Sequence, residues 1–347
     1  MKQGIINLII LLLTLLTFVI SGCTKPGWVM QESGTDNRLT GVWMSNENNG
    51  TAVGDRGLIL KTTDGGGTWI SQESGTEEYL WGVRFSDSMN GWIVGEGSTI
   101  LHTIDGGCTW NRQSNTAPDL IESVFCLNKD TAWAVGFCTI MRTMDGGETW
   151  TRQRISITTD IWDIFFVNAD TGTAVGGWCR SNPPKPYFGG YILHTTNGGV
   201  NWNIQRYDTT IYGFYGVFFT DANTGTVVGA DGTILQTNNG GVTWIKQTSE
   251  TTIDLKDVFF NDADTGTIIG GTINSIKGGT VLRTSDGGRT WIKQIIPTQY
   301  ALYKVCFTDA NTGTVVGAKG TILRTTTGGE HSLGIYRAII RDNKSKR

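Results

Sequence analysis

The chain has 347 residues, of which 48 are glycine, and its 28 basic and 31 acidic residues give a formal net charge of −3. Five of the basic residues lie within positions 331–347, so the rest of the chain is distinctly acidic. An acidic body argues against a nucleic-acid partner, which would require a basic face. The six cysteines show no repeating spacing and no CxxC pair, so the sequence predicts neither a disulfide framework nor a metal site.

The first residues have the pattern of a targeting segment. Ile5–Ile20 is almost wholly apolar and is followed by Ile20-Ser21-Gly22-Cys23, which resembles a bacterial lipobox. We therefore expect residues 1–22 to be a signal peptide and Cys23 to be the lipidation site. This resemblance implies a lipid-anchored protein of the cell envelope, at the outer membrane or surface in a Gram-negative cell. An uncleaved membrane anchor is the alternative, because the apolar run approaches spanning length.

One eight-residue pattern, Thr-x-Asp/Asn-Gly-Gly-x-Thr/Asn-Trp, recurs along the chain. It occurs at Thr62–Trp69, Thr103–Trp110, Thr143–Trp150, Thr195–Trp202, Thr237–Trp244 and Thr284–Trp291, with an unfinished copy at Thr325–Glu330. Asp-Gly and Asn-Gly favour tight hairpin turns, because the central residues need positive φ. A tryptophan then anchors the next strand by burying a large ring. We interpret these acidic residues as turn residues, not as catalysts or metal ligands.

This pattern resembles the Asp-box, or BNR repeat, which is found in sialidases, in some glycoside hydrolases and in propellers of the photosystem II assembly and stability factor family. Length, repeat and lipobox are most similar to those assembly factors, many of which are lipoproteins. The resemblance implies a non-catalytic scaffold that binds a partner during assembly. It implies a fold more strongly than a function, because unrelated activities share the repeat.

The third positions of the boxes are spaced by 40 to 52 residues, which is the period of a propeller blade with four strands. Seven first strands and seven third strands can be aligned, but only six boxes end in tryptophan. The missing fourth strand matches Trp28–Thr35, which resembles Trp69–Thr76. The sequence therefore predicts an all-β, seven-bladed propeller over residues 23–330, closed by an N-terminal strand that completes blade seven. Residues 331–347 form a basic C-terminal tail.

Two sets of positions repeat with the blades. The residue before each box is usually basic, and we interpret this set as polar contacts between blades: Lys61, His102, Arg142, His194, Gln236, Arg283 and Arg324. The residue after the first apolar position of each inner strand should lie at the mouth of the central channel: Thr40, Trp81, Glu122, Trp162, Tyr215, Lys256 and Tyr303. Packing between blades is one interpretation of this second set. An aromatic binding surface is the other.

A long insertion at Gly177–Gly190 should rise beside the mouth in blade four, and it carries residue types common at binding hot spots. The predicted binding site comprises Trp162, Trp178, Arg180, Tyr187, Tyr215, Trp81 and Tyr303. The expected partner is an envelope protein or a glycan. We expect a monomer with a lipid anchor in the membrane and without a nucleic-acid partner or a cofactor.

An enzyme is the alternative function. Glycoside hydrolysis needs two carboxylates at a defined separation, and Asp163, Asp257 and Glu122 are the candidates. The positions equivalent to Asp163 hold Gly41, Gly82, Ser123, Gly216 and Lys304, a variation that suggests drift and not a built site. The arginine segment of the sialidases, Phe/Tyr-Arg-Ile-Pro, is not found in this sequence.

Overall fold

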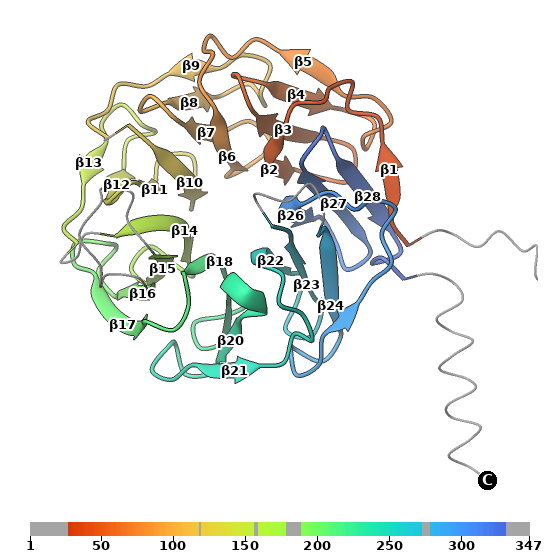
Figure 1. Cartoon of the computed structure of the whole chain (residues 1–347). Coiled ribbons are helices and arrows are strands. Elements are labelled where there is room, and N and C mark those ends of the chain that lie inside the picture. The colour runs from red at the N-terminus through yellow and green to blue at the C-terminus, as the bar shows by residue number, and fades with distance from the viewer. Residues whose placement is uncertain (1–26, 118, 156–158, 178–188, 273–277, 331–347) are drawn as a thin grey trace, which may run out of the picture.

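A computed structural model describes residues 27–117, 119–155, 159–177, 189–272 and 278–330. These residues form seven four-stranded antiparallel sheets that follow one another around a central axis, as Figure 1 shows. The predicted seven-bladed propeller is therefore confirmed. The predicted signal peptide, Cys23 and the C-terminal segment 331–347 lie outside the described residues.

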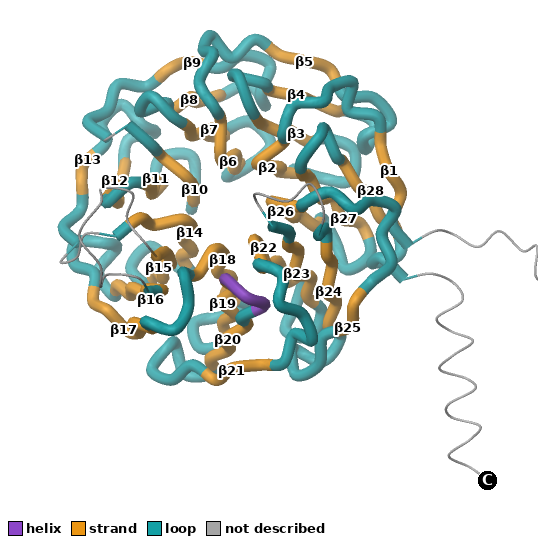
Figure 2. The backbone as a smooth tube through the Cα atoms, in the orientation of Figure 1, coloured by secondary structure: helices purple, strands orange, loops and turns teal. Residues whose placement is uncertain are grey.

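Each of the first six blades is built from four consecutive strands, numbered outward from the axis. Blades one to three comprise β2 (Leu39–Met44), β3 (Gly50–Gly54), β4 (Ile59–Thr62), β5 (Ile70–Gln72), β6 (Leu80–Phe85), β7 (Gly91–Gly95), β8 (Ile100–Thr103), β9 (Asn111–Arg112), β10 (Ile121–Cys126), β11 (Ala132–Gly136), β12 (Thr139–Thr143) and β13 (Thr151–Arg152). Blades four to six comprise β14 (Asp160–Phe166), β15 (Gly172–Gly177), β16 (Gly190–Thr195), β17 (Asn203–Asp208), β18 (Phe214–Phe219), β19 (Gly225–Gly229), β20 (Ile234–Thr237), β21 (Ile245–Gln247), β22 (Leu255–Phe260), β23 (Gly266–Gly270), β24 (Thr280–Thr284) and β25 (Ile292–Lys293). Within the described chain a single 3₁₀ turn, Ala230–Gly232, stands at the mouth of the ring in blade five (Figure 2).

Blade seven takes its strands from both ends of the described chain. Its inner three strands are β26 (Leu302–Phe307), β27 (Thr312–Gly317) and β28 (Ile322–Thr326), and its outer strand is β1 (Val29–Gln31). Met30 lies opposite Leu323 in the antiparallel register. The neighbouring Trp28 is buried and contacts Phe307 edge to face at a centroid separation of 6.0 Å. The predicted closure is confirmed, and β1 covers the outer edge of β28, which would otherwise be unpaired.

The hydrophobic core is divided into seven clusters, and each cluster lies between two neighbouring blades. The second strands are buried along their whole length, and each third strand buries two adjacent apolar residues, so both faces of each sheet are apolar and both are covered. Cys126 and Cys306 are buried in two of these clusters, as small hydrophobic residues would be. Burial raises the pKa of the Cys306 thiol to about 11, so this thiol stays protonated.

The Asp-box turns repeat one hydrogen-bond pattern. In blade six, the Thr284 hydroxyl donates to the Asp286 carboxylate at 2.7 Å and accepts the Gly288 N–H at 2.9 Å. The carboxylate also accepts from the Thr290 hydroxyl and N–H. These bonds, the Thr290 hydroxyl first, lower the pKa of Asp286 to about 2. The interpretation of the box as turn structure is confirmed, because its carboxylate is occupied within the turn.

Candidate binding surface at the mouth of the channel

A β-bulge at the same place in every blade shapes the mouth of the channel. In all seven inner strands the pairing register shifts across one residue near the start of the strand, for example between Ile161 and Asp163 and between Phe214 and Gly216. A bulge leaves one residue out of the ladder and redirects its side chain. The bulged residues are the seven that the sequence places at the mouth: Thr40, Trp81, Glu122, Trp162, Tyr215, Lys256 and Tyr303.

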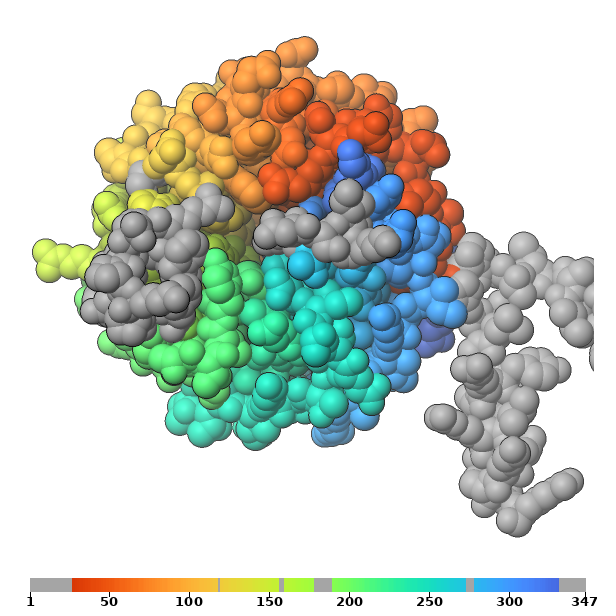
Figure 3. All heavy atoms as spheres, in the orientation of Figure 1, coloured from red at the N-terminus to blue at the C-terminus, as the bar shows by residue number. Residues whose placement is uncertain are grey.

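Blades four, five and six carry an ordered aromatic cluster, which we call the platform: Trp162, Tyr212, Tyr215 and Lys256. Trp162 stacks on Tyr215 at a centroid distance of 4.9 Å and on Tyr212 at 6.1 Å. The Lys256 ammonium lies 3.6 Å from the centre of the Tyr215 ring. Figure 3 shows the same face with all atoms drawn, and the green and cyan atoms of these blades adjoin one another there. The expected packing between blades is therefore present, and the rings of Trp162 and Tyr215 remain partly exposed.

Charged partners hold the platform in place. The Asp254 carboxylate accepts a bond from Lys256 at 3.0 Å and from the Asp231 N–H at 3.2 Å. Burial, followed by the Asp254 charge and its bond to the phenol, raises the pKa of Tyr215, so the hydroxyl stays protonated. Burial lowers the pKa of Lys256, which Asp254 opposes. An aromatic surface that is fixed in this way loses little conformational entropy when it binds.

The other mouth residues have separate environments. The Arg38 guanidinium lies over the Trp81 ring at 4.7 Å and is paired with Asp55 at 2.9 Å, so blades one and two carry a second cation–aromatic contact. Thr40 is buried and donates to the Leu80 carbonyl at 2.5 Å. Glu122 and Tyr303 are half-buried.

The predicted insertion lies largely outside the described residues, and this includes Trp178, Arg180 and Tyr187. Its base is described. A Cβ atom placed on Gly177 would come within 2.8 Å of the Trp162 ring, and one on Gly213 within 2.2 Å. Gly177 and Gly213 also form a bridge between blades four and five. The insertion therefore starts directly against the platform, which requires glycine at both positions.

Two acidic residues and one lysine meet inside the channel. Lys304 lies 3.0 Å from Asp257 and 3.7 Å from Asp163, and it comes from blade seven, opposite Asp163 in blade four. The second oxygen of each carboxylate accepts a main-chain N–H from the next blade, Val305 at 2.9 Å and Val217 at 3.0 Å. These side chains are built into one network, so the interpretation of their positions as drift is wrong.

Burial and mutual charge shift the pKa values of two residues in this network, Asp257 and Lys304. Burial raises the pKa of Asp257 to about 6, with Lys304 opposing this shift and Asp163 adding to it. Burial would lower the pKa of Lys304, but the two carboxylates together raise it. The cavity beside them has a volume of about 50 Å³, which accommodates a water molecule or two. A sugar ring cannot lie between two carboxylates that share one lysine in such a space, and Glu122 does not line this cavity.

Sequence reasoning missed the role of Lys304, because it compared blades by position and did not ask which positions face one another across the axis. A signal was present, since the position that holds Asp in blades four and six holds Lys only in blade seven. Across the described ranges, no three His, Cys, Asp or Glu residues are grouped as metal ligands. In the part of the chain that the structure describes, no helix has the length and apolarity needed to cross a bilayer.

Three of the seven residues before the boxes contact the next blade through its main-chain carbonyls. Arg283 of blade six donates to the Ala310 carbonyl of blade seven, and Gln236 of blade five to the Gly287 carbonyl of blade six. Arg324 of blade seven donates to the Glu47 carbonyl of blade one at 2.5 Å. Arg283, Arg324 and Gln236 therefore secure the turns of neighbouring blades, whereas His102 and His194 contact Trp92 and Thr173 of their own blades.

Comparisons with known proteins agree with this architecture. The family model described as photosynthesis system II assembly factor YCF48 matches residues 21–118 and 70–160. The structure of YCF48 bound to D1 peptide is 21% identical, with a TM-score of 0.70, and the match covers 87% of this chain and 97% of that one. YCF48 from Cyanidioschyzon merolae is 24% identical, with a TM-score of 0.68, covering 86% and 98%.

A more distant likeness is to the GH74 enzyme of Niastella koreensis, at 14% identity and a TM-score of 0.67, covering 86% of this chain and 53% of the enzyme. No match was found among curated proteins. Identities this low establish a shared fold and leave the function to the site. The chain is a seven-bladed propeller of BNR repeats that resembles the photosystem II assembly factor family.

Proposed function

We propose that this protein is a non-catalytic scaffold that captures a segment of a protein partner at the mouth of its channel. The observation that carries the proposal is the platform, in which Trp162 and Tyr215 are stacked and partly exposed, and in which Lys256 and Asp254 hold Tyr215. Tyr and Trp give large contact areas at low entropic cost, and Arg and aromatic residues dominate binding hot spots. The YCF48 relative in complex with a D1 peptide supports a protein partner over a glycan.

The cellular setting is part of the same proposal. Acylation at Cys23 would tether the propeller to a membrane of the cell envelope, where its partner would be an envelope or membrane protein. The support is the lipobox-like Ile20-Ser21-Gly22-Cys23 at the end of an apolar run. Metabolic labelling with a palmitate analogue tests the anchor, and Cys23→Ala should abolish both the label and membrane fractionation. A Cys23→Ala protein that remains labelled in the membrane fraction would contradict it.

Capture of the partner tests the platform. The wild-type protein would be crosslinked in intact cells and its partner identified, after which Trp162→Ala and Tyr215→Ala variants would be compared in a pull-down. Each substitution should lower affinity by tenfold or more, since truncating a hot-spot aromatic residue costs about 2 kcal/mol or more. Ile292→Ala, at an exposed position on the outer rim, is the matched control and should bind normally. If folded platform variants retain full capture, the partner binds elsewhere.

A further inference from the structure

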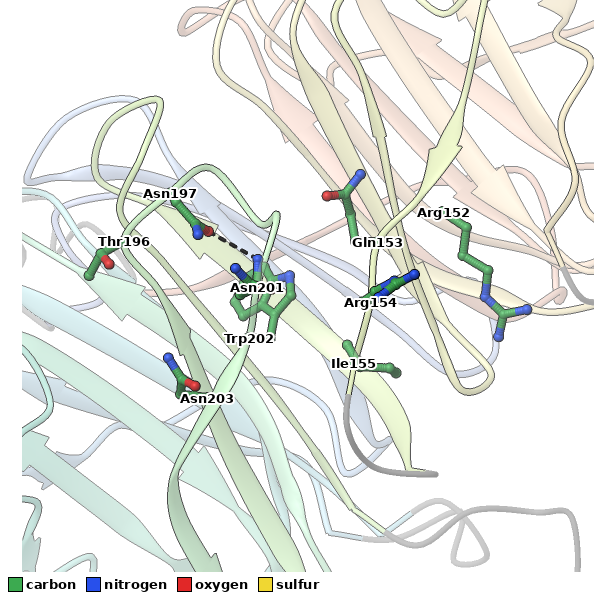
Figure 4. Close-up of a pocket in the computed structure, with 9 residues that line it drawn as sticks. All are labelled: Arg152, Gln153, Arg154, Ile155, Thr196, Asn197, Asn201, Trp202 and Asn203. Carbon is green, nitrogen blue, oxygen red and sulfur yellow. Dashed lines mark hydrogen bonds between the residues drawn. The ribbon is translucent and has the colours of Figure 1, made fainter.

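A cleft lies between blades three and four, and the function proposed above does not use it. Its volume is about 880 Å³, within the range of about 300–1,000 Å³ typical of ligand pockets. Figure 4 shows Gln153, Arg154 and Ile155 of blade three on one side, with Asn197, Asn201 and Trp202 of blade four across from them. The backbones of Arg154 and Asn201 are joined in a parallel bridge, which holds the two sides together.

At this cleft one contact between blades differs from the contact found at four other interfaces. At four other interfaces a fourth-strand glutamine donates to the first glycine carbonyl of the next Asp-box: Gln31 to Gly65, Gln113 to Gly146, Gln205 to Gly240 and Gln294 to Gly328. Between blades three and four the Trp133 indole donates to that carbonyl instead, at 3.1 Å from Gly198. Gln153 donates to the Thr151 carbonyl of its own strand, as Gln72 does to Ile70 in blade one, and the buried Trp202 Nε1 has no partner among the described residues.

The Asp-box of blade four also differs from the others at this cleft. In the five other boxes that end in tryptophan, a bond between side chains closes the turn: Thr68–Asp64, Thr109–Asp105, Thr149–Asp145, Thr243–Asn239 and Thr290–Asp286. Blade four has Asn201 in place of threonine, and only its main-chain N–H reaches Asn197, at 3.0 Å. The Asn201 amide therefore remains available, and Asn203 adds another on the same wall.

The residues that line the cleft carry positive charge, whereas the chain as a whole is acidic. Arg154 is exposed and makes no side-chain hydrogen bond or ion pair with any residue in the described ranges. The equivalent position is Glu32 in blade seven and Glu73 in blade one. No carboxylate lines the cleft, although the protein is acidic overall. An exposed arginine without a counter-ion favours a carboxylate or another oxyanion.

We infer that this cleft binds an acidic saccharide. The amides of Asn201 and Asn203 each offer a donor and an acceptor, which match neighbouring sugar hydroxyls. Gln153 adds its amide oxygen and Asn197 its NH2 group, because the Gln153 NH2 group donates to Thr151 and the Asn197 oxygen is held within the turn. Arg154 supplies the partner for the acid group. A peptide would need apolar pockets for alternate side chains, and the apolar side chains that line the cleft are Ile155 and the buried Trp202.

The test measures the binding of three acidic saccharides by calorimetry: a uronate trisaccharide, sialyllactose and a sulfated disaccharide. Maltotriose, a neutral saccharide, and triglutamate, an acidic peptide, are measured for comparison. At least one acidic saccharide should bind, more tightly than maltotriose and triglutamate, with an affinity that falls as salt rises. Arg154→Gln should weaken it about tenfold or more, as expected for loss of one charge-assisted hydrogen bond. Asn201→Thr restores the usual turn and should also weaken it.

Arg112→Gln, which changes an exposed arginine of the neighbouring blade, and Thr243→Asn, the reverse change in blade five, are the controls and should leave binding intact. Trp162→Ala should also leave it intact, which separates this site from the platform. The proposal is overturned if no acidic saccharide binds, if maltotriose or triglutamate binds as tightly, or if neither Arg154→Gln nor Asn201→Thr weakens binding.

Discussion

At the scale of single residues, Lys304 balances the negative charge in the middle of the channel. It is partly buried and compensates two buried carboxylates that come from two other blades. Removing one partner of a buried ion pair costs far more than the pair contributes, because the remaining charge is left uncompensated. Asp163 and Asp257 keep their main-chain donors, but neither donor carries a full charge.

We therefore expect Lys304→Met to lower the free energy of unfolding at pH 7 by about 3 kcal/mol. The pKa of Asp257, about 6 in the folded protein, lies above its ordinary value of 3.8. The folded state thus binds more protons between these values, and the carboxylate's contribution to stability falls as pH rises through this window. The loss in Lys304→Met should accordingly be smaller at pH 5 than at pH 7 in urea unfolding. Lys293→Met, on an exposed outer strand, should be neutral, and an equal loss at both pH values would contradict the assignment.

At the scale of elements, the Asp-box turn explains why seven blades of varied sequence have one shape. Two consecutive glycines adopt positive φ in every turn, for example 68° at Gly240 and 84° at Gly241. The buried threonine hydroxyl joins the third residue to the second glycine. Asn and Asp are interchangeable at the third position, because either side chain offers the oxygen that the turn requires.

Thr237→Val tests this turn. The substitution keeps the shape of the side chain but removes the hydroxyl that accepts the Gly241 N–H at 2.9 Å. Leaving this buried N–H without a partner should cost about 1–3 kcal/mol, seen as a lower midpoint in chemical denaturation. Asn238→Ala, at the exposed position beside it, should change the midpoint little. A Thr237→Val protein as stable as the wild type would show that the turn does not need the hydroxyl.

Repetition also decides how much could be predicted from the sequence. Strand order, blade number and the closing strand at Trp28 follow from comparing the chain with itself, because each repeat carries the same turn and the same buried anchor. The bulged mouth positions were found in the same way. The ion pairs of Lys304 and the hydrogen bond from Trp133 to Gly198 were not predicted. Both depend on which side chains meet across the channel or between two blades, and the spacing of repeats along the sequence does not give this information.

At the scale of the whole molecule, the ring is a closed series of seven similar interfaces, each with its own apolar cluster. Trp28 contributes to the cluster between blades six and seven, and its indole donates to Gln294 at 2.7 Å. A break at one interface therefore exposes apolar surface on two blades and frees a strand edge. The free energy of unfolding should therefore depend on the closed ring more than on any single sheet.

Deleting residues 26–32 should for this reason destabilise the entire ring. We expect a lower melting temperature for the single cooperative transition and a tendency to associate through the exposed edge of β28, measured by calorimetry and light scattering. Substituting Glu32 alone by Ala, at an exposed position after β1, serves as the control. A deleted protein that keeps its full melting temperature and stays monodisperse would refute the role of β1.

The meeting of β1 and β28 has one more implication. Gly27 lies so close to Gly329 that a Cβ atom on Gly27 would fall within 2.3 Å of the Gly329 carbonyl oxygen. A short linker could therefore join the two ends of the described fold, and the polypeptide could be opened at a surface turn of another sheet. Such a circular permutant would start from a different blade and still form the same contacts, so the order in which the blades are synthesised is not dictated by the architecture.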